Sequence, residues 1–227
     1  MVKIAVVMPT LNEAASITDS LQRIRNEWPH ELVVVDGGSS DDTVALAREQ
    51  GVQVLESTPG RAVQQNRGAA ATSSEVLLFL HADCSLEPGS LRFLRAYLEE
   101  HPQVSGGCFR MRVTSKSPLF RAIDLAGDVR AALIGIPYGD QGIFTRRKIF
   151  ETLGGFPELP LMEDVFFSIR LRQEGRIAVV PRRIFVSARR WRKRGIIGQT
   201  LLNWSLTIAA AANVPPFRLA RFYPVVR

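Results

Sequence analysis

Three clusters of polar residues stand directly after apolar runs, which is where side chains can bind a ligand at the end of a strand. "PTLNE" follows the run that includes Met8, "DGGSSDD" follows Val35, and "HAD" follows Leu80. Helix N-termini beyond these loops would present N–H groups suited to phosphate, so the clusters together predict a nucleotide or sugar-phosphate site. Any one cluster alone is equally well explained as a helix cap or a turn, so the prediction rests on all three lying together.

The aspartate of the third cluster, Asp83, is a candidate metal ligand. A carboxylate is a hard oxygen donor, and Mg²⁺ or Mn²⁺ bound to it could bridge two phosphates while keeping several waters. One protein carboxylate is enough when the substrate supplies further oxygens. The alternative is that Asp83 only caps the following turn.

Glu163 and Asp164 form a fourth candidate group, in "MEDVFFSIRL". They precede an apolar run with helical spacing, so they fall near a helix N-terminus, where negative charge is favourable. Capping explains one of the two acids. The other suits a general base that takes a proton from a sugar or lipid hydroxyl.

The elements that must position these groups alternate along the first half of the chain. Short, almost continuously apolar runs predict strands that are covered on both faces, and helical patterns lie between them. The predicted strands are Ile4–Met8, Leu32–Val35, Val52–Leu55 and Val76–Leu80. This alternation predicts right-handed crossovers and a mainly parallel sheet, whose strands all end at one edge. The three clusters should therefore meet there, and Gly37 and Gly38 would let the backbone approach a ligand closely.

The second half of the chain is less regular. We expect strands at Gly106–Val113, Gly142–Thr145 and Ile177–Val180, and helices at Leu119–Leu133 and Val165–Glu174. The apolar stretch Ile196–Val214 is interrupted by polar residues, so we predict a helix that does not span a membrane.

Composition and charge narrow the class of protein. With 227 residues and 46% hydrophobic residues, the chain fits one folded domain. The first apolar run, Ile4–Met8, is short and is followed by Pro9, so it does not have the pattern of a leader, and Cys84 and Cys108 lack metal-ligand spacing. We therefore expect a cytoplasmic protein with packed thiols. The net charge is +7, and 11 Arg or Lys follow the last acidic residue, Glu174. This basic end is either a solvated surface or a site for an anionic partner. "RRWRKR" has one aromatic residue and no recognised nucleic-acid module around it, so we expect no nucleic-acid partner.

Common nucleotide motifs are absent from the sequence. The turn in "PTLNEA" has no glycine, so the G-x-G-x-x-G loop is missing, and no P-loop motif occurs. The diphosphate must be held in another way.

The motifs as a set resemble the family 2 glycosyltransferases with a GT-A fold. The resemblance rests on "VVMPTLNEA", "VVVDGGSSDDT", "GRAVQQNRGA", "LFLHADC", "YGDQGIF" and "MEDVFFSIRLRQEG", in that order. "GRAVQQNRGA", "LHAD" and "GDQGIF" are most similar to the radical-SAM/selenodomain-associated subfamily. The resemblance implies an α/β fold with a mainly parallel sheet flanked by helices. It also implies a catalytic domain over 1–194, with a nucleotide-binding half at 1–100 and an acceptor half at 101–194, followed by a C-terminal helix and tail at 195–227.

The resemblance also implies which residues bind the donor. Asp36 would accept a hydrogen bond from the base, typically uracil, beside Gly37, and Asp83 would match the metal-binding aspartate of the D-x-D signature. His81 stands at the place of the first aspartate of that signature, with Ala82 between them. The remaining donor residues would line the nucleoside pocket or lie near the ribose and diphosphate: Pro9, Thr10, Leu11, Glu13, Arg61, Gln64, Asn66 and Gly68.

On the acceptor side, the resemblance implies an inverting transfer with Asp164 as the base and Glu163 supporting it. The residues that would border the acceptor or neutralise the diphosphate are Gly139, Asp140, Gln141, Arg189, Arg190 and Trp191. The expected partners are a nucleotide-sugar donor and an acceptor hydroxyl. The C-terminal helix, with Trp204 and neighbouring aliphatic residues, suits an anionic membrane face and a lipid-linked acceptor, or packing on the catalytic domain or on a second subunit. A sugar-phosphate nucleotidyltransferase and a non-catalytic nucleotide-sugar binding module remain as alternatives.

Overall fold

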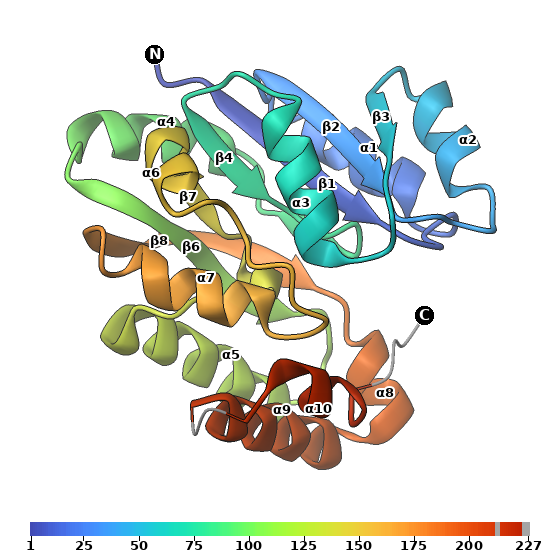
Figure 1. Cartoon of the computed structure of the whole chain (residues 1–227), viewed down its shortest axis with the longest axis vertical. Helices are drawn as coiled ribbons and strands as arrows, with labels where there is room; N and C mark the ends of the chain where they lie inside the picture. The colour runs from blue at the N-terminus through green and yellow to red at the C-terminus, as the bar shows by residue number, and fades with distance from the viewer. Residues whose placement is uncertain (212–213, 224–227) are drawn as a thin grey trace.

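An eight-stranded sheet runs through the part of the chain that the structure describes (Figure 1). The structure, a computed structural model, describes residues 1–211 and 214–223, without the side chains of Arg190, Lys193, Arg194 and Ala211. The strand order is β3-β2-β1-β4-β7-β6-β8-β5. The strands are β1 (Ile4–Thr10), β2 (Glu31–Asp36), β3 (Gln53–Glu56), β4 (Val76–Phe79), β5 (Cys84–Leu86), β6 (Val104–Val113), β7 (Phe144–Arg146) and β8 (Arg176–Val186).

The parallel arrangement predicted for the first half is confirmed. β3, β2, β1 and β4 are parallel neighbours, and β6 and β8 are also parallel. β7 joins the two groups by antiparallel pairing with both β4 and β6, and β5 pairs antiparallel with β8. Each of the seven predicted strands is present, whereas β5 was missed because three residues are too few to show a period.

Helices cover both faces of the sheet because alternate side chains of the strands point to opposite faces. On one face, Ile4, Val6 and Met8 of β1 belong to a core shared with α1 (Ile17–Arg25), α2 (Thr43–Glu49), α4 (Ser90–Glu100) and α5 (Leu119–Val129). On the other face, Ala5 and Val7 belong to a core shared with α3 (Arg61–Ala70), α6 (Arg147–Thr152) and α7 (Glu163–Leu171). Cys84 and Cys108 are both buried and unpaired, as expected for packed thiols.

The long helix predicted over Leu119–Leu133 is divided in two. α5 ends at Val129, and the chain continues as a π-helical turn over Arg130–Ile134, which ends at Gly135 with φ +71°. A second short turn, the 3₁₀ segment Gly139–Gln141, precedes β7.

The C-terminal part folds back beside α5 and α7. α8 (Arg189–Arg194), α9 (Ile196–Ala211) and α10 (Pro216–Ala220) follow β8, and Figure 1 shows α9 beside α5. Leu206 and Ala210 of α9 are buried in a small core with Leu161, Met162 and Val165. On this face the helix therefore packs on the preceding part of the chain, which is one of the alternatives considered above. Within the described residues, none of the helices combines the length and apolar character needed to cross a membrane.

Candidate functional site

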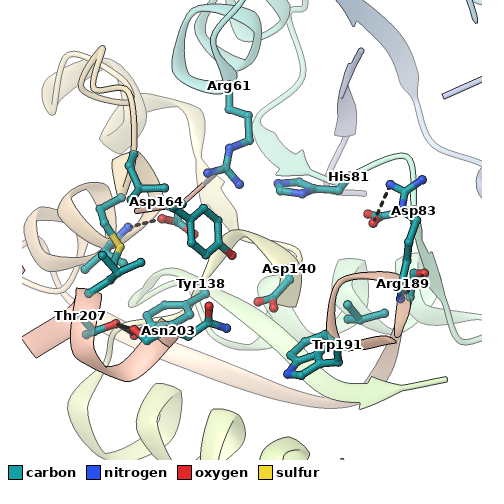
Figure 2. Close-up of a pocket in the computed structure, with 17 residues that line it drawn as sticks. Arg61, His81, Asp83, Tyr138, Asp140, Asp164, Arg189, Trp191, Asn203 and Thr207 are labelled. Atoms are coloured by element: carbon teal, nitrogen blue, oxygen red, sulfur yellow. Dashed lines mark hydrogen bonds and ion pairs between the residues drawn. The ribbon is translucent and has the colours of Figure 1, made fainter. Parts of the chain in front are cut away.

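A cavity of about 140 Å³ lies where β4, α7, the Gly139 turn and α8 come together (Figure 2). Its lining includes predicted site residues from distant parts of the chain. These are Arg61, His81, Asp83, Asp140, Asp164, Arg189 and Trp191. The donor-side and acceptor-side motifs of the sequence therefore share one pocket.

Asp164 stands at the start of α7, directly after a sharp turn in the chain. Met162 adopts a left-handed conformation with φ 67°, which is uncommon for a residue with a side chain. The N–H of Gly139 donates to Asp164 Oδ2 at 2.7 Å, and the N–H of Val165 donates to Oδ1 at 2.8 Å. Two backbone donors thus fix the carboxylate plane in the pocket.

Gly139 is also the point where His81 and Asp164 approach each other. A Cβ at this position would lie 3.1 Å from His81 Nε2 and 3.2 Å from Asp164 Oδ2, which is tighter than ordinary contact. A side chain here would push the two groups apart. The glycine of the "GDQ" motif therefore keeps the strand-end histidine next to the candidate base.

Glu163 does not line this cavity and forms an ion pair with Arg61. Its side chain is 3% exposed, and its Oε1 lies 2.8 Å from Arg61 Nε. Burial raises the pKa of Glu163, against the lowering effect of Arg61, and the charge of Glu163 in turn raises the pKa of Arg61. Glu163 therefore holds Arg61, and it is Arg61 that reaches the pocket.

Asp83 and Glu13 both interact with Arg189 from α8. Arg189 Nη2 lies 3.1 Å from Glu13 Oε1 and 3.7 Å from Asp83 Oδ2. Burial lowers the pKa of Arg189, but the hydrogen bond from its guanidinium to Glu13 and the charges of both acids outweigh this effect and raise it. The side chain of Asp83 is still 33% exposed, so one edge of the carboxylate faces the cavity.

This donor set fits a divalent ion only if the substrate supplies further ligands. Among the described residues, no group of three or more His, Cys, Asp or Glu could hold a metal ion. A single accessible carboxylate beside a diphosphate is a usual arrangement for Mg²⁺, which keeps several waters and takes phosphate oxygens. Asp83 is the residue that would hold the ion.

Asp36, at the end of β2, is almost fully buried and binds its own loop. Its Oδ1 accepts hydrogen bonds from the hydroxyls of Thr10 and Ser39 at 3.2 and 2.5 Å, and its Oδ2 accepts from the N–H groups of Gly38 and Ser39 at 2.9 and 2.7 Å. Gly37 has no room for a side chain, since a Cβ would lie 2.9 Å from Gln64 Cδ. The four donors fix the shape of the "DGGS" turn.

Three of the four α3 residues that were predicted near the ribose and diphosphate do not line the cavity and contact only the protein in this structure. Gln64 donates to the carbonyl oxygens of Thr10 and Val35 at 2.7 and 2.8 Å. Asn66 exchanges two hydrogen bonds of 2.9 Å with the backbone of Phe156. Gly68 is buried where a Cβ would lie 2.3 Å from Val7 Cγ1. Arg61, the fourth, is the one that lines the pocket.

Gln141, which is fully buried, stabilises the Gly139 turn through hydrogen bonds. Its Oε1 accepts from Arg130 Nη2 at 2.6 Å and from the Tyr138 N–H at 3.2 Å. The Arg130 guanidinium lies 3.2 Å above the Tyr138 ring. Gln141 therefore positions the turn, while Asp140 faces the cavity.

The other predicted residues lie around the site. Trp191 is buried, contacts the Phe120 ring edge to face, and donates to Thr200 Oγ1 at 3.3 Å. Pro9 and Ala82 are buried and Leu11 is partly buried. The side chain of Arg190 lies outside the described part.

Several lining residues were not predicted from the sequence, above all those of the C-terminal helix. Asn203, Leu206 and Thr207 of α9 line the cavity, and Tyr138 precedes the "GDQ" motif. The spacing of three and four residues puts Asn203, Leu206 and Thr207 on one face of a helix. The sequence pattern does not show that this face lies next to Asp164.

Comparison with known proteins gives consistent relatives. Residues 5–160 match the sequence profile of the family described as Glycosyl transferase family 2. A PGL/p-HBAD biosynthesis glycosyltransferase of Mycobacterium tuberculosis is 30% identical over 212 residues, which is 88% of this chain and 80% of the relative.

Solved structures give the same fold. The Pyrobaculum calidifontis mannosyltransferase PcManGT, in complex with GDP-Man and Mn²⁺, superposes with a TM-score of 0.69 at 23% identity, over 92% of this chain and 61% of that one. S. aureus TarS in complex with UDP gives a TM-score of 0.68 at 20% identity, over 82% and 60%. The chain thus spans about 60% of the length of these solved relatives.

Proposed function

The chain belongs to glycosyl transferase family 2 and has the GT-A fold; from this premise we propose that it transfers a sugar from a nucleoside-diphosphate donor to an acceptor hydroxyl, with inversion at the anomeric carbon. The observation that carries the proposal is the shared pocket of Asp83, His81, Asp164, Arg61 and Arg189. Asp164 is placed to act as the base, and Asp83 suits a metal ion bound to a diphosphate. Both line one cavity together with the guanidinium groups of Arg61 and Arg189.

The transfer is a direct displacement. The acceptor oxygen forms a bond to the anomeric carbon as its proton passes to Asp164, and the bond from that carbon to the diphosphate oxygen breaks. The N–H groups of Gly139 and Val165 hold the Asp164 carboxylate while this happens. Glu163 supports the step indirectly, because it holds Arg61 at the edge of the pocket.

The departing diphosphate needs positive charge. A Mn²⁺ or Mg²⁺ ion held by Asp83 would supply it as a Lewis acid when bound. Arg61 and Arg189 line the same pocket, and guanidinium groups suit bidentate hydrogen bonds to phosphate. The Mn²⁺ in the PcManGT complex supports this part of the proposal.

For the donor we propose a UDP-sugar, with the nucleoside at the β1–β2 edge formed by Thr10, Leu11, Glu13 and the Asp36 turn. The UDP complex of TarS supports uracil, and the GDP-Man complex of PcManGT makes guanine the alternative to test. Because Asp36 already accepts four internal hydrogen bonds, its contribution is to hold the turn in shape for the base.

The finer assignments are part of the same proposal. We place the chain in the radical-SAM/selenodomain-associated subfamily on the strength of "GRAVQQNRGA", "LHAD" and "GDQGIF". The basic C-terminal quarter favours peripheral contact with an anionic membrane and a lipid-linked acceptor, rather than a homodimer.

The test is a thermal-shift and hydrolysis screen of UDP, GDP and their sugars, with and without Mn²⁺. We expect UDP to raise the unfolding temperature more than GDP, with a larger shift when Mn²⁺ is present, because ligands that bind only the folded state stabilise it. Stabilisation by neither nucleotide in either condition would refute donor binding. A larger shift with GDP would mean that the donor carries guanine and not uracil.

A further inference from the structure

An apolar groove lies beside the candidate active site, between α5 and α9. Its volume is about 580 Å³, and most of its lining is aliphatic or aromatic. Cavities of this size hold small-molecule ligands or segments of them, and an apolar lining selects an apolar occupant.

The α5 wall of the groove is a helical stripe with small side chains at its centre. Leu119, Ala122, Ile123, Ala126 and Gly127 line the groove, with the spacing of three and four residues that places them on one face. Ala122 and Ala126 fill little of the space between the helices. The hollow is therefore a direct result of the residue sizes on this face.

α9 is apolar on two opposite faces. Leu206 and Ala210 on one face are buried in the core beside Met162. Ile197, Leu201, Trp204 and Ile208 repeat at the same spacing on the other face, yet they are 70%, 57%, 55% and 69% exposed, and all four line the groove. An unused apolar face of this kind marks an interaction site on a folded protein.

The groove is continuous with the pocket that contains Asp164. Tyr138, Asp140, Trp191, Asn203 and Thr207 line both cavities, and Figure 2 shows their side chains in the pocket that contains Asp164. The Tyr138 hydroxyl and Thr207 Oγ1 are 2.7 Å apart. The surface thus changes from charged around Asp164, through a junction of mostly uncharged polar groups that also includes Asp140, to apolar along α5 and α9.

We propose that this groove binds the apolar chain of an amphiphilic acceptor whose hydroxyl lies at Asp164. The inference rests on the proposed function for the identity of the reactive group, and on the groove itself for the apolar chain. One molecule with a hydroxylated head and an aliphatic tail matches the polarity along both cavities. A second copy of the protein docked on α9 would cover the exposed face but would not account for the continuity of the groove with the Asp164 pocket.

The test compares two probes that differ only in their apolar chain, methyl β-D-glucoside and n-dodecyl β-D-glucoside, the latter below its micelle concentration. Binding is followed by tryptophan fluorescence, since Trp191 and Trp204 line the groove. We expect the dodecyl probe to bind at least tenfold more tightly. Equal affinity for the two probes would overturn the proposal.

Two variants locate the effect. Ala126→Phe fills the groove from an exposed position, and the control Leu125→Phe adds a similar ring at a neighbouring exposed position of α5 that is not part of the groove lining. We expect the tenfold preference to fall below twofold in Ala126→Phe and to persist in Leu125→Phe. Ile197→Glu, which replaces a 70% exposed side chain, gives the same result independently of packing. An unchanged preference in Ala126→Phe and Ile197→Glu would refute the groove as the binding site.

UDP titration of the same variants separates this proposal from the proposed function. We expect UDP affinity to be unchanged in Ala126→Phe, since the groove lies beyond the acceptor end of the pocket. If the wild type fails to bind any nucleotide but keeps the chain-length preference, the transferase proposal fails and the groove stands. If sedimentation shows a wild-type dimer that Ala126→Phe dissociates, with no chain-length preference, the occupant is a second copy and the acceptor groove is refuted.

Discussion

The β1–β2 edge and the Asp164 pocket are both predicted binding regions, but they are built in opposite ways. At the edge, Asp36 is 2% exposed and accepts three hydrogen bonds from its own loop and one from Thr10 of β1. In the pocket, Asp83 is a third exposed, and among the described side chains the cation that pairs with it is Arg189, at 3.7 Å. In the first region the polar groups bind one another and fix the shape of the loop. In the second, charged groups remain partly exposed and can contact a ligand.

Polar residues at strand ends can therefore either fix the shape of a loop, as Asp36 does, or face a ligand pocket, as Asp83 does. The residue type alone does not distinguish these two functions. Substitutions at the β1–β2 edge should lower the free energy of unfolding and thereby weaken binding. Substitutions in the pocket should lower the rate with little effect on folding. The following predictions test that division.

Asp164→Asn gives the largest expected effect. Loss of a general base costs about 10²–10⁴-fold in rate, and the amide can still accept the hydrogen bond from the Gly139 N–H. We expect kcat to fall by that factor while UDP affinity, measured by calorimetry, and the unfolding temperature remain close to wild type. Transfer at the wild-type rate would show that another group takes the proton.

Asp36→Ala should act mainly on stability. Three donors of the "DGGS" turn and the buried Thr10 hydroxyl lose their acceptor, and we expect a loss of about 2–4 kcal/mol in the free energy of unfolding. Urea denaturation measures it. Asp42→Ala is the matched control, because Asp42 is exposed in the same loop and makes no side-chain cap hydrogen bond. Equal losses in the two variants would break the comparison.

The sequence predicted the donor half well because each signal there is local. The alternation of short apolar runs with helical patterns predicted β1 to β4. Because β1, β2 and β4 are parallel neighbours, "PTLNE", "DGGSSDD" and "HAD" follow these strands at the same edge of the sheet. Asp83 and Asp164 were likewise predicted from residue type and position at the end of a strand and the start of a helix. Both line the same pocket.

The rest could not be predicted because it depends on contacts between distant segments. The partner of Glu163 is Arg61, 102 residues earlier, and the partner of Glu13 is Arg189, 176 residues later. No pattern of residue spacing in the sequence indicates either pairing. In the same way, Gln64 and Asn66 have the polar character of ligand residues, and only the fold shows that their amides bind the backbone of β1, β2 and Phe156.

Gly68→Ala distinguishes packing from donor contact in α3. The new Cβ would lie 2.3 Å from Val7 Cγ1 and 3.0 Å from Val35 Cγ2, so α3 must move away from the sheet, at a cost of about 1–3 kcal/mol. Gly198→Ala in α9 is the control, since nothing lies within 4 Å of a Cβ there. We expect Gly68→Ala to lower the urea midpoint while nucleotide affinity, measured below the unfolding transition, stays within twofold. A loss of affinity in a fully folded Gly68→Ala protein would place the diphosphate against α3.

Arg189→Met gives the smallest expected effect and addresses the competition for Asp83. Arg189 shares its guanidinium between Glu13 and Asp83, so a cation bound at Asp83 and the arginine repel each other. Removing the arginine should favour Mn²⁺ at Asp83, whereas nucleotide binding without metal should weaken because one positive charge leaves the pocket. We expect UDP affinity to fall about 2–5-fold without Mn²⁺ and to change less with it, since an exposed ion pair is worth about 1 kcal/mol or less. Calorimetry in both conditions measures the difference, and Arg48→Met, which removes an exposed ion pair with Glu56, is the control. An equal fall with and without Mn²⁺ would mean that Arg189 contacts the diphosphate without opposing the metal, and that Asp83 is available to the ion in either case.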